Sequence, residues 1–409
     1  MKNLDEALDW LYSNKSKVKD IQLKRISFIL NELDLYPKYK TVVVAGTNGK
    51  GSTVALLERI LMNKGYLVGS FTSPFVIEFN ERIKIASKNI SDSKALEYLN
   101  YLYDYQKEYQ KRFNDTIPFF ELCLIMALLY FKDNRVDVGI FECGIGGRYD
   151  ATNVINADVS IITSIGYDHL DRLGSSLNEI LYHKIGIARR NKPLVLALDG
   201  FNDILEAYKN DGYIIDNIYN DVANISVNSM TCFSYKGKRY RTNLLGSFQA
   251  YNMALAIRAA SYLDKDISYK EANTLYASMP GRLDILSLRP LIIADGAHNI
   301  SAIEALMENA LAFNRRLIIL YASLADKEYG KILKYLNSYA TSFIFTYLPD
   351  KRAVEPNELI KYIDKPYKIE GLSNIIENIR INADEALLVT GSLHFISYFL
   401  NMYKELKKN

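Results

Sequence analysis

The chain has 409 residues, more than a single hydrophobic core normally serves, so we expect two domains. Hydrophobic residues make up 49% and charged residues 24%, as in an ordinary globular protein. The 50 Lys and Arg residues nearly balance the 47 Asp and Glu residues, and a net charge of +3 argues against nucleic acid or an anionic membrane as a partner.

The first residues lack the basic-then-apolar layout of a signal peptide, and no apolar run is long enough to cross a bilayer. We therefore expect a cytoplasmic, monomeric protein that acts on small molecules. The three cysteines, Cys123, Cys143 and Cys232, are scattered and odd in number, which predicts buried thiols rather than disulfides or a zinc site.

Two short amphipathic helices are expected before residue 40, because leucines and isoleucines recur there at helical spacing. A strand follows over 41–45, and then the loop Gly46-Thr-Asn-Gly-Lys-Gly-Ser52 leads into apolar residues at helical spacing. Backbone N–H groups of such a loop bind phosphate, and Lys50 adds a cation. The alternative is a simple glycine-rich turn, but a lysine flanked by two glycines has little structural purpose.

The loop departs from the usual nucleoside-triphosphate pattern, because Val44 stands where its first glycine would be and Gly51 separates the lysine from Ser52. It instead resembles the phosphate loop of the Mur ligase superfamily, in particular of its folylpolyglutamate synthase branch. The resemblance implies that Lys50 is catalytic and that the loop binds ATP through Thr47, Asn48, Gly49, Lys50, Gly51 and Ser52.

A second strand over 66–71 ends in Thr-Ser-Pro, and the chain then runs through the string Phe-Asn-Glu-Arg-Ile at 79–83. This segment resembles the S-P-H and F-N-E-R-I strings of the same family, with Phe75 in place of the usual histidine. The resemblance implies that Ser73 binds Mg²⁺, although a Ser-Pro turn explains the serine without a metal.

An exposed helix is expected over 92–112 and a more buried one over 119–130. Glu121 in the second helix is either functional or a carboxylate that satisfies backbone donors at the helix start. Short strands over 136–141, 158–163 and 193–198 alternate with helices. This order predicts an α/β fold with a doubly wound parallel sheet, whose ligand site lies beyond the carboxyl ends of the strands.

Glu142 follows one of these strands and opens a string that matches the family pattern E-x-G-x-G-G-x-x-D-A-T-N throughout. A carboxylate beside glycines suits Mg²⁺, which prefers a few hard oxygen ligands and keeps several waters. His169 follows the next strand in the string I-G-x-D-H-x-x-x-L-G. By this resemblance Ser73, Glu142 and His169 hold Mg²⁺, whereas a capping acid and a structural histidine are the alternatives.

Lys184 lies in a segment that resembles the family string I-A-x-E-K-x-G-I, with His183 in place of the glutamate. In the family this lysine is typically carbamylated and helps to hold a second metal, so Lys184 is a candidate catalytic residue. The alternative is a solvent-facing lysine on a helix.

The pattern changes to short alternating strands around 222–246, which predicts a β-hairpin decoration, and a helix follows over 248–263. Strand and helix alternation restarts after Pro280-Gly281, with strands expected over 291–294, 316–321, 342–346 and 386–389. We therefore expect a P-loop domain over 1–280 and a smaller C-terminal α/β domain over 281–409.

Three further strings resemble the family and extend the site. The string at 246–252 keeps Asn252 as a nucleotide contact, with Phe248 in place of a histidine. Arg282 offers a guanidinium to phosphate. Asp295 and His298 lie in Asp-Gly-Ala-His-Asn, where the resemblance implies a nucleotide contact and a catalytic histidine.

The resemblance implies an ATP-dependent ligase that adds L-glutamate to a folate through an acyl phosphate, with ATP and Mg²⁺ as cofactors. A bifunctional enzyme that also joins glutamate to dihydropteroate is the first alternative. A cell-wall Mur ligase is a second, which the folate-branch strings disfavour. A non-catalytic nucleotide-binding relative is a third, which the retention of Lys50, Glu142, His169 and Lys184 disfavours.

Overall fold

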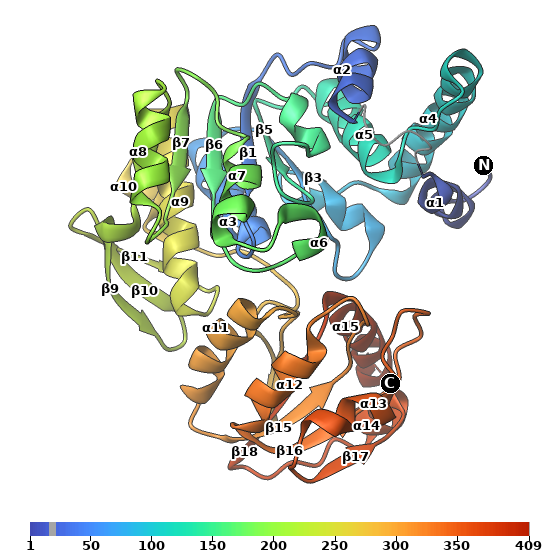
Figure 1. Ribbon diagram of the computed structural model, residues 1–409, viewed down its shortest axis with the longest axis vertical. Helices are drawn as coiled ribbons and strands as arrows, with labels where there is room; N and C mark the ends of the chain where they lie inside the picture. The colour runs from blue at the N-terminus through green and yellow to red at the C-terminus, as the bar shows by residue number, and fades with distance from the viewer. Residues whose placement is uncertain (16–21, 409) are drawn as a thin grey trace. The chain divides into compact units, whose positions relative to one another are not determined.

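The computed structural model describes residues 1–15 and 22–408 and divides into two compact units, which are treated separately below (Figure 1). Unit 1 comprises Met1–Asn224, Phe233–Arg241 and Ala250–Ala277. Unit 2 comprises Ile225–Cys232, Thr242–Gln249 and Ser278–Asn409. The helical region expected before residue 40 includes residues 16–21, which lie outside the described residues.

Unit 1 is built on an eight-stranded sheet with the order β4-β3-β2-β5-β1-β6-β7-β8. The strands are β1 (Lys40–Ala45), β2 (Val68–Phe71), β3 (Ile83–Ile85), β4 (Lys88–Asn89), β5 (Val138–Glu142), β6 (Val159–Ile162), β7 (Pro193–Leu196) and β8 (Ile214–Asn217). From β2 to β8 all pairs are parallel, and β3 and β4 add an antiparallel edge. The predicted parallel sheet is therefore confirmed.

Helices connect these strands, as the alternating pattern predicts. They are α1 (Leu4–Ser13), α2 (Gln22–Glu32), α3 (Lys50–Lys64), α4 (Asp92–Phe113), α5 (Phe119–Asp133), α6 (Leu170–Leu173), α7 (Leu177–Ile185), α8 (Asn202–Asn210), α9 (Ser247–Leu263) and α10 (Tyr269–Ala272), with 3-10 helices η1 (Phe79–Arg82), η2 (Ala151–Val154) and η3 (Tyr219–Asp221). Gly65 ends α3 in a left-handed conformation, with φ at 103°, which a residue without Cβ adopts easily.

Both faces of this sheet are buried. Val43 and Ala45 on β1 belong to a core cluster with Phe71, Phe141 and the apolar residues of α5. Their neighbours Val42 and Val44 point to the other face and are buried as well. Because neither face of the central strands meets water, the first strand is a continuous apolar run rather than an alternating one.

A small four-stranded sheet with the order β12-β11-β10-β9 follows in the region of the predicted hairpin. Its strands are β9 (Val222–Val227), β10 (Thr231–Tyr235), β11 (Lys238–Thr242) and β12 (Thr274–Leu275). Lys236 and Gly237 turn the chain between β10 and β11, and both have positive φ.

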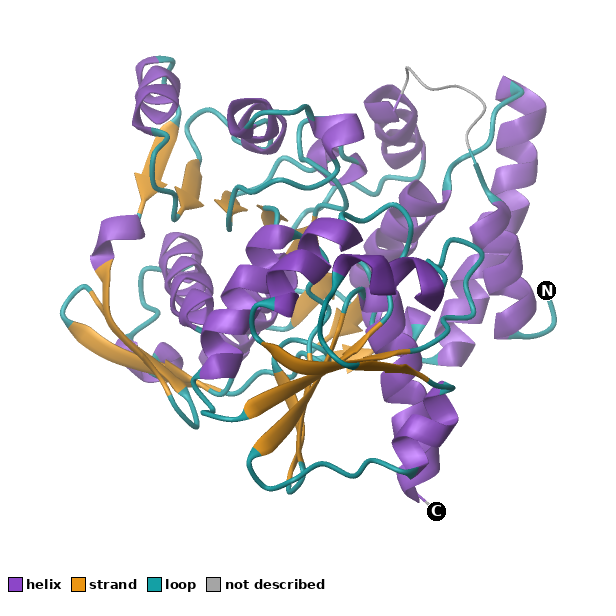
Figure 2. Ribbon diagram, turned by 60° about the horizontal axis from the view of Figure 1, so that its bottom comes forward, coloured by secondary structure: helices purple, strands orange, loops and turns teal. Residues whose placement is uncertain are grey.

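Unit 2 is built on a six-stranded sheet with the order β13-β14-β18-β15-β16-β17, whose strands fan out by their twist in Figure 2. The strands are β13 (Asp284–Leu288), β14 (Leu291–Ala294), β15 (Arg316–Tyr321), β16 (Ala340–Phe345), β17 (Tyr367–Ile369) and β18 (Glu385–Thr390). All pairs are parallel except β13 with β14. The helices are α11 (Ile300–Leu311), α12 (Tyr329–Asn337), α13 (Pro356–Leu359), η4 (Ile360–Tyr362), α14 (Leu372–Glu377) and α15 (Leu393–Lys408).

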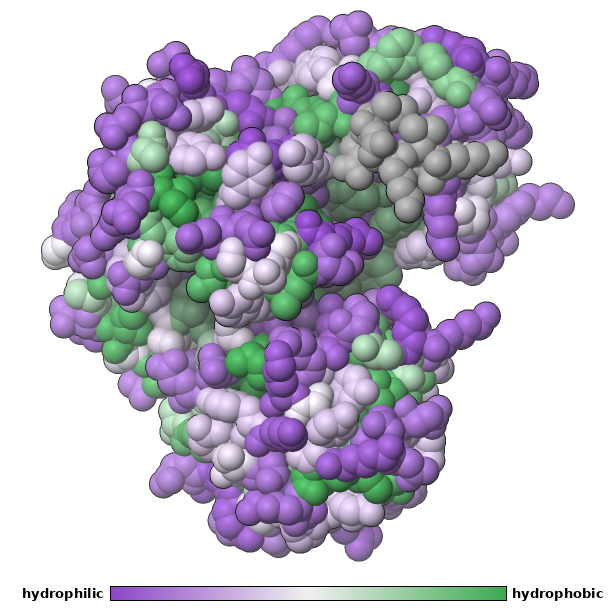
Figure 3. All heavy atoms as spheres, in the orientation of Figure 1, coloured by the Kyte–Doolittle hydropathy of each residue, from purple (hydrophilic) through white to green (hydrophobic). Residues whose placement is uncertain are grey.

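None of the helices within residues 1–15 and 22–408 combines the length and the apolar character that a bilayer span requires. Figure 3 shows hydrophilic side chains over most of the face in view, with hydrophobic side chains gathered in smaller groups.

Candidate active site

The glycine-rich loop joins β1 to α3. Lys50 is the first residue of α3, and its Nζ donates to the carbonyl oxygens of Gly46 at 3.0 Å and Thr47 at 3.2 Å, so the ammonium group lies against the loop. Gly49 caps the helix with φ at 86°, and a Cβ there would lie 2.4 Å from Oδ1 of Asn252. The loop therefore requires glycine at this position, and the structure brings Asn252, predicted as a nucleotide contact, beside it.

Hydrogen bonds to the segment after β6 fix the shape of this loop. The N–H of Thr47 donates to the carbonyl of Ser164 at 2.9 Å, and the N–H of Asn48 donates to the Ser164 hydroxyl at 2.9 Å. The Thr163 hydroxyl donates to the carbonyl of Asn48 at 2.6 Å. Sequence reasoning assigned no role to Thr163 and Ser164; hydroxyl residues at the carboxyl end of a buried strand were the available signal.

The loop, Ser73 and His169 follow the carboxyl ends of β1, β2 and β6, and Glu142 is the last residue of β5. These four strands are neighbours in the sheet. The N–H of Ser73 donates to Oε2 of Glu142 at 3.2 Å, so two of the three predicted metal ligands are adjacent. His169 is the N-cap residue that precedes α6, and its backbone is left-handed, at φ 50°. The edge of the sheet thus gathers the groups that the doubly wound topology predicts there.

The described part of the chain holds no group of three His, Cys, Asp or Glu side chains placed to bind a metal ion. The predicted set has a different chemistry, because it combines one carboxylate, one hydroxyl and one imidazole. A small divalent cation that keeps several waters fits such a sparse set of protein ligands.

Lys184 is buried in α7, with 3% of its surface exposed, so it is not the solvent-facing lysine of the alternative reading. Burial and, as a smaller contribution, the positive charge of Lys50 together lower its pKa from 10.5 to about 7. A capping box formed by Ser176 and Glu179 fixes the start of this helix. The amino group is therefore held in a place where the neutral form is accessible near neutral pH.

His183 precedes this lysine and contacts two tyrosine rings edge-on, at 5.7 Å from Tyr149 and 5.6 Å from Tyr182. Burial lowers its pKa, and the charges of Arg148 and Lys184 add to the effect. The imidazole is accordingly a neutral aromatic partner at neutral pH and supplies none of the negative charge of a glutamate.

Three predicted residues of unit 2 lie together at the carboxyl end of β14, with Asp295 and His298 after this strand and Arg282 just before its neighbour β13. Asp295 accepts hydrogen bonds from the N–H groups of Leu283 at 2.6 Å and Ala297 at 2.7 Å. Its pKa is raised by burial, an effect that the positive charge of Arg282 opposes. Nδ1 of His298 lies 2.8 Å from the carbonyl oxygen of Gly296. These contacts place Arg282, Asp295 and His298 around one strand end.

Glu121 has a partner that neither sequence interpretation named. Its two carboxylate oxygens accept hydrogen bonds from Nε of Arg25 at 2.9 Å and from Nη2 at 2.7 Å, and Nη1 of Arg25 donates to Asp115 at 2.8 Å. All three side chains are buried. The carboxylate therefore belongs to a buried ion-pair network and does not cap its helix.

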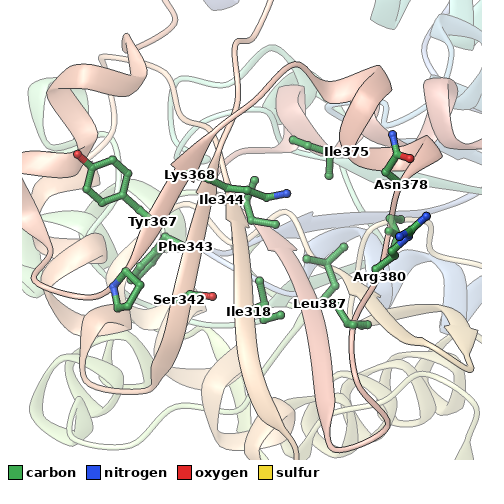
Figure 4. Close-up of a pocket in the computed structure, with 13 residues that line it drawn as sticks. Ile318, Ser342, Phe343, Ile344, Tyr367, Lys368, Ile375, Asn378, Arg380 and Leu387 are labelled. Atoms are coloured by element: carbon green, nitrogen blue, oxygen red, sulfur yellow. The ribbon is translucent and has the colours of Figure 1, made fainter.

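A separate pocket of about 280 Å³ lies within unit 2 against β15, β16 and β18 (Figure 4). Ile318, Ser342 and Leu387 line its floor, Lys368 lies beside Ile344, and Arg380 lies at one side. It contains none of the residues predicted for the site, which in this unit lie at the carboxyl end of β14.

Comparison with known families gives two matches along the chain. Residues 44–260 match the Mur ligase middle domain, and residues 281–393 match the Mur ligase glutamate ligase domain. The first match contains the glycine-rich loop and Lys184, and the second contains Arg282, Asp295 and His298.

Similar proteins cover nearly the whole chain. The Bacillus subtilis dihydrofolate synthase/folylpolyglutamate synthase is 34% identical over 386 residues, which are 88% of this chain and 89% of that protein. Escherichia coli FolC in complex with DHPP and ADP is 28% identical with a TM-score of 0.88, and 99% of each chain is covered. The bifunctional Yersinia pestis enzyme complexed with AMPPNP and Mn ion is 26% identical with a TM-score of 0.85, and 98% of each chain is covered.

Proposed function

Because the chain belongs to the dihydrofolate synthase/folylpolyglutamate synthase family of Mur ligases, which are ATP-dependent ligases, we propose that it adds L-glutamate to the terminal glutamate of a folate. The observation that carries the proposal is the sequence similarity to the Bacillus subtilis enzyme, which extends over 88% of this chain and 89% of that protein. The phosphate loop and the buried lysine Lys184, both in unit 1, support it. The activity belongs to folate metabolism and requires ATP.

In the first step the γ-phosphoryl group of ATP moves to a carboxylate oxygen of the acceptor, which gives an acyl phosphate and ADP. The P–O bond to ADP breaks as the bond to the carboxylate forms. Lys50 lies at the loop where the phosphates would bind, so its charge would neutralise the transferring group. Thr47, Asn48, Gly49, Gly51 and Ser52 are proposed to hold the phosphates, and Asn252 to contact the nucleotide beside Gly49.

In the second step the amino group of L-glutamate attacks the acyl carbon and phosphate leaves, so that an amide bond forms. Arg282 is proposed to bind phosphate through its guanidinium group, and Asp295 to contact the nucleotide. His298 is proposed as a catalytic residue of the same strand end.

We propose Mg²⁺ as the metal, held by Ser73, Glu142 and His169. When bound, such an ion supplies positive charge that offsets the charge on the phosphate oxygens. The adjacency of Ser73 and Glu142 supports this set, and the Mn ion of the Yersinia pestis complex is a metal of the same class.

Carbamylation of Lys184 is proposed as well. A lysine must be neutral to react with CO₂, and a pKa of about 7 leaves a large neutral fraction at neutral pH. The Nζ atom of Lys184 forms a bond to the carbon of CO₂ and loses one proton to solvent. The resulting carbamate is an anion near Lys50, and this carbamate would hold a second metal.

A second candidate activity is the joining of glutamate to dihydropteroate, since the Bacillus subtilis relative carries both names. We further propose residues 1–280 as the ATP-binding domain and 281–409 as the C-terminal domain, which agrees with a second family match that starts at residue 281. Cell-wall and non-catalytic functions receive no support from the relatives named above.

The test is ADP release by the purified protein with ATP, Mg²⁺ and L-glutamate, with tetrahydrofolate or dihydropteroate as acceptor. Release with tetrahydrofolate alone establishes the first activity, and release with both acceptors establishes the bifunctional enzyme. A folded protein that binds ATP and releases no ADP with either acceptor would refute the proposal.

A further inference from the structure

Arg82 ends the 3-10 helix η1 in unit 1 and is buried, with only 7% of its surface exposed. Its carbonyl oxygen accepts the N–H of Thr72 at 2.9 Å, which fastens it beside the segment that carries Ser73. The backbone of Arg82 is thus held beside Thr72, which precedes the serine whose N–H donates to Glu142.

The guanidinium group of Arg82 lies near two aromatic rings. Its central carbon lies 5.3 Å from the centroid of Phe75 and 5.1 Å from that of Phe119. Nε and Nη1 are buried, and within residues 1–15 and 22–408 neither has a hydrogen-bond partner. Rings stabilise a cation through their faces but accept no in-plane hydrogen bond, so Nε and Nη1 remain unsatisfied.

Other arginines of unit 1 receive oxygen partners from the chain. Arg25 is bonded to two carboxylates, and Arg258 is bonded to Asp216. Arg189 donates to a series of carbonyl oxygens. The contrast shows that this protein normally pairs an enclosed guanidinium group, as the desolvation of charged donors requires.

Arg112 is the closest match to Arg82, because it too lies near two rings, at 5.6 Å from Phe28 and 5.0 Å from Phe113. It differs in two respects, since its side chain is 47% exposed and its Nη1 donates to Oε1 of Glu32 at 2.5 Å. The same aromatic setting therefore occurs with a carboxylate at Arg112 and without one at Arg82.

We propose that Arg82 is a carboxylate receptor, and that a carboxylate of a substrate completes the pairing that the chain leaves open. A carboxylate is planar and matches either edge of a guanidinium group with two parallel N–H···O bonds. Phe75, which stands where the family pattern has a histidine, offers this arginine no acceptor of its own. The inference rests on the proposed function for the identity of the substrates, namely a folate or pteroate acceptor and L-glutamate.

Two sources of carboxylate follow from that reaction, the acceptor and free L-glutamate, and binding experiments distinguish them. The probes are tetrahydrofolate, dihydropteroate, L-glutamate, ADP, and the acceptor with its carboxylates converted to carboxamides. Titration calorimetry with each probe compares wild type with Arg82→Met and Arg82→Lys. Arg112→Met is the matched control, because it removes a ring-flanked arginine that already has its carboxylate.

Arg82→Met is expected to raise the dissociation constant of the docking ligand about 100-fold, as expected for a truncated partner of a buried charge pair. Arg82→Lys keeps the positive charge but loses the planar pair of N–H donors, so its dissociation constant should lie between those of wild type and Arg82→Met. The ADP and carboxamide probes should bind wild type and Arg82→Met alike. A change confined to tetrahydrofolate and dihydropteroate identifies the acceptor, and a change confined to L-glutamate identifies the amino acid.

Stability separates this role from a structural one. Because the arginine is unpaired, replacing it with methionine should leave the melting temperature unchanged or raised, whereas a structural arginine would lower it. The proposal is overturned if Arg82→Met binds every carboxylate probe as wild type does, or if it loses ADP, carboxamide and carboxylate binding equally with a lower melting temperature. ADP release by wild type tests the reaction separately, so a failed assay with altered carboxylate binding would refute only the proposed function.

Discussion

Replacing Lys184 with methionine should stabilise the protein while removing its activity. Lysine and methionine have similar lengths, so the substitution keeps the packing of α7 and removes the buried amine. Burial and the charge of Lys50 lower the pKa of Lys184 from 10.5 to about 7, which means that folding disfavours its ammonium form. This penalty is absent from Lys184→Met.

The size and pH range of the effect follow from linkage. A shift from 10.5 to about 7 corresponds to at most about 5 kcal/mol, at about 1.4 kcal/mol per pKa unit. Between these two values the unfolded chain binds more protons than the folded one, so the stability of wild type rises with pH across that window. Below about pH 7 both states are protonated, and the penalty is constant and complete.

The assay is thermal unfolding in CO₂-free buffer at pH 7 and pH 10, for wild type and Lys184→Met. We expect a melting temperature about 10 °C higher for the variant at pH 7, and a much smaller difference at pH 10. Lys192→Met is the control, because that lysine is part-exposed and paired with Asp158. Added bicarbonate should stabilise wild type alone, with an intact-protein mass that reports the carbamate. Equal pH slopes in wild type and Lys184→Met would refute the reasoning.

Three further predictions concern the sheet edge. Lys50→Ala should lower ADP release about 10²–10³-fold with an unchanged circular dichroism spectrum, because a half-buried lysine at the start of α3 stabilises phosphoryl transfer more than packing; near-wild-type release would contradict its role. Glu142→Gln and His169→Ala should each raise the Mg²⁺ concentration needed for half-maximal ADP release, and unchanged metal dependence in both would place the ion elsewhere. Gly49→Ala should weaken ADP binding about tenfold, since φ is 86° and its Cβ would lie 2.4 Å from Asn252 Oδ1; calorimetric titration with unchanged affinity would show that the loop tolerates a side chain.

The sequence predicted those elements whose apolar pattern is local. The strand over 41–45 and the helix after Lys50 were found because their side chains are buried in continuous or helical runs. β13 and β17 were missed, since the residues of β13 are largely part-exposed and β17 has only three residues, two of them exposed. The order of strands in each sheet was also beyond the sequence, because it depends on pairings between distant segments.

The candidate site divides in the same way. Motif strings located Lys50, Glu142, Lys184 and Asn252, but the contact of Asn252 with the loop joins residues about two hundred positions apart and has no local signature. The burial of Lys184 likewise required the structure. The sequence Lys-Ile-Gly on a short helix is compatible with an exposed or a buried lysine. The pKa of Lys184 is lowered by its burial and by the charge of Lys50, and neither can be predicted from the local sequence.

The spacing of residues in the sequence does not show whether a buried arginine has a carboxylate partner, as Arg25 and Arg82 illustrate. We expect replacement by methionine to have opposite effects on stability at these two positions. Arg25 is bonded to Asp115 and Glu121, so Arg25→Met would leave two buried carboxylates without a cation and should cost about 3–5 kcal/mol at pH 7.

That loss corresponds to a melting temperature about 10 °C lower, whereas Arg82→Met should leave it unchanged or raised. The measurement is calorimetric unfolding of the two variants beside wild type in one buffer. A buried arginine supports the fold when the chain supplies its carboxylates, and it is available to a ligand when the chain does not. Equal destabilisation by both substitutions would show that Arg82, too, is held by the fold.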